Sequence, residues 1–482
     1  IKQFAIKYLQ AKNIFDSNMV RVLQCNFEHC DLPLTPVVIS MYLSMFSIYG
    51  DTIKGISLAA LIERIENMKL VSDVYNLRII LRDFAKALYI KRVKFISEDE
   101  FKALIGDYFE DKNLLYKLDD CVSTFLSSGL IRIDDGKVSF SYYIFYDFYV
   151  ARALVATSLD INGFTSNINN IIRNSDTLAM YGAIERDDEQ ALEDLVLQIM
   201  ETFDKRAHNS YSLSFLDKFI DHMLCSESIS DEDADRIAEH DISEQEDCEK
   251  LENEFQENRI SYQHNHGGSA EEKDDAGIEF ISKLIMALKA FYNLLRNLEN
   301  ISGKRKEEYL DLILDYHIYC NFMIIAFFNE ITSHDKKFQS MTAYLFTMGG
   351  QSFLSREMWS PNLRITIENC IEKTNNDFKK YLLICLYTEG RFSKYITYVE
   401  DFIEQTTSKA ALEMLYFRVR EMMITSDKKD IPASLIALFK KIYNKRKKYF
   451  FSEKISAAQV IAETKKSHSL HLWKKNMNKS LE

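Results

Sequence analysis

The dipeptide Asp135-Gly136 constrains the fold of this chain more than any other feature, because it is a strong hairpin signal in a sequence that otherwise favours helices. Segments 130–134 and 137–140 alternate apolar and polar residues on either side, which predicts two short antiparallel strands. Elsewhere the 482 residues include only 4 prolines and 14 glycines and are 47% apolar. We therefore expect a mainly α fold with two or more domains.

Two helices are expected directly before this hairpin. Ser97-Glu-Asp-Glu100 is a capping box and predicts a helix over 98–109, with an inward face formed by Phe101, Leu104, Ile105 and Tyr108. A second helix is predicted over 115–127, ending before Gly129. Two helices followed by a β-hairpin predict a winged-helix domain. DNA reading by its second helix is disfavoured, because this helix carries one cation, Lys117, against two carboxylates, Asp119 and Asp120.

A proline pair marks a further helix start, at the segment Asp31-Leu-Pro-Leu-Thr-Pro36. Thr35 is predicted as the N-cap and Pro36 as the first helical residue, where a missing N–H costs nothing. The next ten residues are almost entirely apolar, so we expect that helix to be buried. The segment either forms the wall of a binding site or is a well-made helix start in a packed core.

The proline segment resembles the element that follows the sensor strand in STAND ATPases, the NACHT-like family, in its prokaryotic antiviral form. A second resemblance to the same family lies at residues 138–154, where a strand end passes into an aromatic helix. The positions that match it are Phe140, Tyr142, Asp147, Phe148, Tyr149 and Ala151. From burial statistics alone, we expect Phe148 and Tyr149 to be core residues.

This resemblance, which covers about residues 1–155, implies a bound nucleotide. ATP or ADP would lie with its adenine against Pro33 and Pro36, and Tyr142 stands where many relatives have a histidine that senses the β-phosphate. The ATPase domain with its Mg²⁺ is expected before Ile1. No Gly-x4-Gly-Lys-Ser/Thr P-loop is present, because Ile131 and Leu298 replace the first glycine of the two candidates. This chain alone is therefore expected neither to hydrolyse ATP nor to bind it.

The expected domains are a helical domain over 1–94, the winged helix over 95–157 and a helical linker over 158–225. An acidic insertion follows over 226–276, with 18 acidic and four basic residues. An α-helical repeat array of TPR or HEAT style is expected over 277–482. Its basic end, residues 436–482, has 12 Lys and Arg against three Glu. That end could hold nucleic acid or a phosphate-rich partner, or could be a solvated basic helix end paired with the acidic insertion.

A concave helix array offers surface for a protein partner, and aromatic and arginine side chains are the usual anchors. The exposed-looking candidates, some of which we expect to be core, are Tyr319, Tyr344, Trp359, Arg391, Tyr395, Tyr398 and Arg418. Eight scattered cysteines suggest reduced thiols, and Cys25 and Cys30 lack the spacing of a zinc knuckle, so no metal is expected.

Together with the expected helix array, the resemblance implies the C-terminal regulatory and sensor portion of a STAND NTPase in antiviral defence. A viral protein on the array would trigger nucleotide-dependent homo-oligomerisation and activate an N-terminal effector. The alternative is a STAND-related transcriptional regulator that contacts DNA through the winged helix or the basic tail. The longest apolar runs are too short to span a bilayer, so we expect a cytoplasmic protein without membrane contact.

Overall fold

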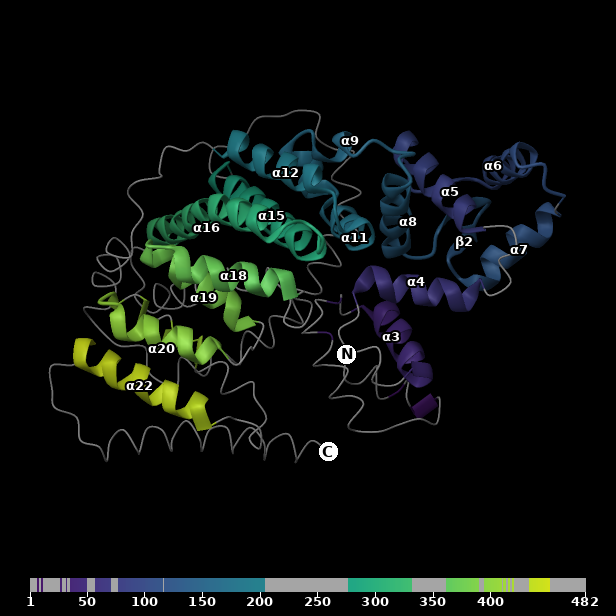
Figure 1. The fold of residues 1–482 in the computed structure, drawn as a ribbon. Coiled ribbons are helices and arrows are strands. Elements are labelled where there is room, and N and C mark those ends of the chain that lie inside the picture. Colours follow the sequence, from purple (N-terminus) through teal and green to yellow (C-terminus); the bar gives the residue numbers. More distant parts are fainter. Residues whose placement is uncertain are drawn as a thin grey trace. The chain divides into compact units, whose positions relative to one another are not determined.

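The computed structural model describes a mainly helical chain (Figure 1). The described residues are 35–49, 57–70, 77–115, 117–203, 276–331, 361–389, 394–409 and 433–450, with single positions 7, 10, 11, 27, 32, 411, 412, 415, 416, 418 and 419. The chain forms two compact units. Unit 1 comprises residues 1–204, 282–310 and 353–366, and unit 2 comprises residues 205–281, 311–352 and 367–482.

Unit 1 begins with three helices, α3 (Pro36–Tyr49), α4 (Leu58–Lys69) and α5 (Leu77–Lys91). The predicted start of α3 is confirmed, since Thr35 Oγ1 accepts the Val38 N–H at 3.4 Å. Its burial is confirmed along most of its length, and Ile48 near its end is exposed. The three- and four-residue spacing of apolar side chains in α4 and α5 explains their buried faces, which include Leu61, Ile62, Ile80, Leu81 and Phe84.

Next come β1 (Ile96–Ser97), α6 (Glu98–Asp111) and α7 (Leu118–Ser128), followed by β2 (Ile131–Asp134) and β3 (Lys137–Phe140). The capping box at Ser97 and Glu100 is confirmed, with both of its hydrogen bonds formed. The hairpin is also confirmed, because Asp135 and Gly136 have φ of 50° and 70°, as a type I′ turn requires. The strands form an antiparallel sheet in the order β1-β3-β2.

The inward face of α6 agrees with the prediction in part. Phe101 and Ile105 are buried as expected, whereas Leu104 and Tyr108 are half-buried and Phe109, which was not predicted, is buried. Phe101 packs edge-on against Phe84 of α5 and Phe125 of α7, with ring centroids 4.8 and 6.0 Å apart. These aromatic contacts form the core between the sheet and the three helices.

The chain continues through α8 (Tyr143–Val155), α9 (Asn162–Thr165), α10 (Ile168–Arg173), α11 (Ser175–Glu185) and α12 (Glu189–Thr202). Phe148 and Tyr149 of α8 are core residues, as predicted. Helices α9 to α11 were not predicted individually. α11 packs closely along α8, and the buried Asp147 carboxylate accepts the Thr177 hydroxyl at 2.7 Å.

The helices α15 (Ala276–Asn297), α16 (Gly303–Ile331) and α18 (Pro361–Lys373) contribute residues to both units. Within unit 1, the Asn297 side chain donates to the Ala179 carbonyl at 2.8 Å. Gly182 of α11 is required by a close approach, since a Cβ there would lie 2.8 Å from a Leu294 methyl group. This contact holds α15 against α11 within unit 1.

Unit 2 also contains α19 (Asp377–Glu389), α20 (Tyr395–Gln405) and α22 (Ala433–Phe450). Phe378 packs edge-on against Phe322 at 5.6 Å between ring centroids, and Tyr416 stacks on Phe439 at 5.3 Å. A buried polar pair joins α18 and α19, where the Tyr387 hydroxyl donates to Glu368 Oε1 at 2.6 Å. Unit 2 is thus held by aromatic packing and a few buried hydrogen bonds.

The mainly α fold class is confirmed, and the described parts of the region 277–482 are mostly helical. Residues 204–225 of the expected helical linker and residues 226–275 of the acidic insertion lie outside the described residues. In the part of the chain that is described, no helix combines the length and the apolar character needed to cross a bilayer.

Candidate functional site

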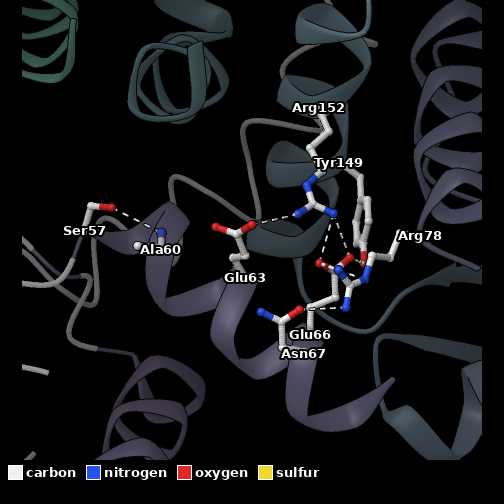
Figure 2. A network of polar contacts seen from close by, with 8 residues as sticks. All are labelled: Ser57, Ala60, Glu63, Glu66, Asn67, Arg78, Tyr149 and Arg152. Carbon is white, nitrogen blue, oxygen red and sulfur yellow. Dashed lines mark hydrogen bonds and ion pairs between the residues drawn. The ribbon is translucent and has the colours of Figure 1, made fainter. Parts of the chain in front are cut away.

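A buried polar cluster centred on Glu66 is the most distinctive site of unit 1 (Figure 2). The Ser57 hydroxyl caps α4 by accepting the Ala60 N–H, and Leu61, Ile62 and Ile65 turn one face of this helix into the core. Glu66 follows one turn after Ile62 on the same face, so its carboxylate is fully buried. A buried carboxylate is tolerated only when it is paired and hydrogen-bonded.

Three side chains surround the Glu66 carboxylate. The Tyr149 hydroxyl donates to Oε1 at 2.5 Å, and Arg152 Nη1 donates to Oε1 at 3.0 Å and lies 2.9 Å from Oε2. Arg78 Nε lies 3.6 Å from Oε2. Glu63 contacts Arg152 Nη2 from the exposed side at 3.5 Å. Two carboxylates therefore balance two guanidinium groups.

The cluster joins three helices that are distant in sequence. Glu66 belongs to α4, Arg78 to α5, and Tyr149 and Arg152 to α8, where they lie one turn apart on one face. The Arg152 guanidinium also lies over the Phe148 ring, 4.6 Å from its centroid. Figure 1 shows α4 passing close to one end of α8, and Figure 2 shows Glu66, Tyr149 and Arg152 pointing toward one another.

Burial controls the protonation of this cluster. Burial raises the pKa of Glu66, while the charge of Arg152, the Tyr149 hydroxyl and Arg78 act in the opposite direction. Burial and the neighbouring Glu66 charge raise the pKa of Tyr149 well above its ordinary value. Tyr149 therefore stays protonated and donates. A carboxylate that is closed to solvent and occupied by donors is suited to hold helices together rather than to transfer protons to a substrate.

A second contact ties the same helix to the region of the hairpin. The Lys69 ammonium at the end of α4 donates to the Ser128 carbonyl at the end of α7. Desolvation lowers the pKa of Lys69. Gly129, which follows, has φ of 68° and ends α7 in the left-handed conformation that glycine adopts without strain. α4 is thus bound to both α7 and α8.

The residues expected at a nucleotide lie at two helix starts of unit 1. Pro36 is the first residue of α3 and is exposed, whereas Pro33 lies outside the described residues. Tyr142 is the N-cap of α8, 49% exposed, with its ring edge-on to Phe145 at 6.0 Å. Both side chains are accessible, and their role toward a nucleotide stays a prediction.

The residues expected to bind a partner divide into three groups. Tyr319 and Tyr398 are half-buried, with Tyr319 edge-on to Phe280 and the Tyr398 hydroxyl donating to Glu372 at 3.1 Å. The expectation of exposure does not hold for Tyr395 and Arg418. Both are buried, because Tyr395 lies on the inward face of α20 and Arg418 Nε donates to Thr388 Oγ1 at 3.2 Å. The remaining three, Tyr344, Trp359 and Arg391, lie outside the described residues.

The described part of the basic C-terminal end is engaged with α20. Lys441 pairs with Glu404 at 2.6 Å and approaches Glu400 at 3.8 Å. The Lys445 ammonium donates to the Thr406 carbonyl at 2.9 Å and to the Ile403 carbonyl. These two cations interact with carboxylates and helix-end carbonyls of the α20 region, and the expected pairing of the basic end with the acidic insertion stays a prediction.

Sequence reasoning missed the roles of Glu66 and Arg152. A usable signal existed in α8, whose residues are apolar or aromatic except for Asp147 and Arg152. A charge inside such a helix must find a partner when the helix is buried. The sequence around Glu66 offers no comparable signal, since a glutamate next to the apolar face of a helix is usually exposed to solvent.

Within the described ranges, no group of three or more His, Cys, Asp or Glu side chains is placed to hold a metal ion. Cys25 and Cys30 lie outside those ranges. Comparison of the chain with protein-family models, with curated proteins and with solved structures yields no match.

Proposed function

We propose that this chain is the C-terminal regulatory and sensor portion of a STAND NTPase in antiviral defence. Residues 1–94 would serve as the helical domain beside an ATPase domain, residues 95–157 as a winged helix, and the later helices as a solenoid that senses a viral protein. Binding of that trigger would favour homo-oligomerisation and activate an effector. The proposal rests on the two sequence resemblances and on the way unit 1 connects them.

The observation that carries the proposal is the Glu66 cluster. α3, which begins at Pro36 of the proline segment, packs on α4, and the Glu66 cluster joins α4 and α5 to α8, which contains most of the aromatic segment. The two segments that resemble the family therefore both contribute helices to unit 1, as parts of one regulatory module should. Interactions of a buried charged cluster are lost together when its helices separate, which suits a two-state element.

The sheet region supports the winged-helix assignment. Helices α6 and α7 precede a hairpin, and β1 adds to the outer edge of β3. This order and the tight type I′ turn are those expected for a wing. The first turn of α7 carries Asp119 and Asp120, so its charge opposes contact with phosphates. Because Lys441 and Lys445 are also engaged within unit 2, the DNA-binding regulator has less support.

ATP or ADP is the nucleotide that the proposal implies. The residues of unit 1 fit one wall of such a site, since the exposed ring of Pro36 offers a flat apolar face for a base. Tyr142 offers an exposed hydroxyl at the start of α8. The triphosphate chemistry and Mg²⁺ coordination would come from the upstream ATPase domain. In this arrangement the chain's own residues hold and report the nucleotide but do not cleave it.

Nucleotide retention in the full-length protein tests the proposal. Replacement Pro36→Glu should greatly reduce the ATP or ADP that copurifies, because a carboxylate would be desolvated against the base and would repel phosphates. The matched control is Ile48→Glu, at an exposed position near the other end of α3. Nucleotide content is measured by denaturing extraction and chromatography. Equal nucleotide content in Pro36→Glu and the control would contradict the adenine-wall role.

A further inference from the structure

Residues 90–95, here called the basic strip, form an exposed run between α5 and the start of β1. Ile90, Val93 and Phe95 are 61%, 42% and 44% exposed, which is unusual for large apolar side chains standing together. The three residues between and beside them are cationic, with no carboxylate in the run. Lys137 of β3 adds a fourth cation, with its ammonium 4.6 Å from the Phe95 ring centroid.

The charge of the basic strip is largely uncommitted. Lys91 pairs with Glu100 of α6 at 2.9 Å. Arg92 and Lys94 form no ion pair with any residue that the structure describes. Arg92 has φ of 54°, so the backbone turns sharply and presents its neighbours on the surface. Apolar side chains beside free cations are suited to an acidic and partly apolar protein surface.

Residues 110–120, here called the acidic corner, have the complementary character. They include four carboxylates against two lysines, a net charge of −2. Leu115 in the loop between α6 and α7 is 97% exposed. Asp111 pairs with Lys112 at 2.8 Å. Asp119 and Asp120 form no close ion pair with a described residue, although Asp119 acts on Lys102 of α6 from a greater distance. An apolar tip therefore stands in the same segment as carboxylates that have no close cationic partner.

The two surfaces form no ion pair with each other in the described structure. The basic strip lies at the N-terminal end of α6, where Lys91 reaches Glu100, and the acidic corner begins at its C-terminal end. The 14 residues of α6 place residues 110 and 111 about 20 Å from the basic strip at 1.5 Å per residue, which exceeds the screening length of about 8 Å at physiological salt. Asp119 lies nearer, within electrostatic reach of Lys102.

We infer that a second copy of this chain docks head to tail, with the basic strip of one copy on the acidic corner of the next. Leu115 would pack on the apolar side chains of the basic strip, and Asp119 and Asp120 would pair with Arg92 and Lys94. Such a contact is heterologous, so it extends into a chain or closes into a ring. This contact would provide one interface for the oligomerisation in the proposed function. The contact itself does not depend on the proposed function, but its biological role does.

Sedimentation velocity of the 482-residue chain over a concentration series tests the contact. A small, charge-dependent interface should be weak and should weaken further with salt. The paired reversals Arg92→Glu with Lys94→Glu, or Asp119→Lys with Asp120→Lys, should each weaken self-association about tenfold or more. The control reversal Lys304→Glu, at a lysine whose side chain is 86% exposed in unit 1, should leave it unchanged.

Two further measurements distinguish a head-to-tail contact from a general charge effect. An equimolar mixture of the two paired-reversal variants should assemble although each variant alone does not, because the intact basic strip of one variant meets the intact acidic corner of the other, and the two reversed surfaces are again opposite in charge. A chain that carries all four reversals should assemble again. Leu115→Ser, which changes no charge, should also weaken assembly, because it removes the apolar side chain that would pack on the basic strip. Circular dichroism verifies that each variant is folded.

A chain that remains monomeric at every concentration, or a mixture of the two variants that associates no better than either variant alone, overturns the inference. Capture of a single-stranded oligonucleotide by wild type but not by the Arg92 and Lys94 reversal, without self-association, would assign the basic strip to nucleic acid instead. The proposed function fails separately, since nucleotide retention in the Pro36 experiment does not involve either surface. A monomer that retains nucleotide overturns this inference alone.

Discussion

Replacing Glu66 by alanine is the sharpest perturbation of unit 1, because it removes the acceptor shared by Tyr149, Arg152 and Arg78. The Tyr149 hydroxyl is fully buried and would lose its acceptor, at a cost of about 1–3 kcal/mol. The lost charge-assisted bond from Arg152 adds about 1.5 kcal/mol, the low end of its range. The low end applies because the Arg152 side chain is 20% exposed and retains its ion pair with Glu63.

The expected loss of unfolding free energy is therefore about 2.5–4.5 kcal/mol, close to the range for breaking a buried ion pair. For a unit of about 150–250 residues this corresponds to a fall in Tm of roughly 5–18 °C. Glu66→Gln should cost less, about 1–2 kcal/mol, since the amide oxygen still accepts from Tyr149 and the buried charge is removed. Glu63→Ala is the matched control and should cost under about 0.5 kcal/mol, because that carboxylate is exposed.

Urea unfolding of the 482-residue chain, followed by circular dichroism, measures these differences. A double-mutant cycle with Tyr149→Phe should give a coupling energy of about 1–2 kcal/mol, because both variants remove the same buried hydrogen bond. If Glu66→Ala costs no more than Glu63→Ala, or if the two losses simply add, the Glu66 cluster does not hold α4 to α8 and the reasoning is refuted.

Three further predictions concern other parts of the chain. Burial lowers the pKa of His317 to about 4, so between pH 4 and about 6.5 the unfolded chain binds more protons than the folded chain. The free energy of unfolding should therefore fall by about 1.4 kcal/mol per pH unit on acidification through this window. His317→Gln should flatten the pH profile of Tm, and an unchanged slope would contradict this. Lys445→Ala should cost about 1 kcal/mol in urea unfolding, because carbonyls at the end of α20 lose their donor, whereas a neutral result would show that water replaces it. Deletion of residues 226–276 with a short Gly/Ser linker should leave Tm nearly unchanged, given their acidity and few large apolar side chains, and a fall of many degrees would show that they pack.

The sequence by itself determined the features that depend on neighbouring residues. The Thr35 cap, the capping box at Ser97 and the Asp135-Gly136 turn follow from hydrogen bonds or backbone angles within four residues. Apolar spacing predicted Phe101 and Ile105 of α6 as buried correctly. It did not predict that Phe109 is buried while Leu104 and Tyr108 are half-buried, because periodicity does not fix the edges of a buried face.

Only the tertiary structure decided which polar side chains are buried and what they meet. Glu66 is separated from Tyr149 by 83 residues and from Arg152 by 86, so no local pattern connects them. Tyr395 and Arg418 were expected on an exposed face, yet packing within unit 2 buries both. Helix propensity and apolar spacing specify a helix and its apolar side, but the partner of a buried charge is chosen by the packing of distant helices, since only there does its desolvation find compensation.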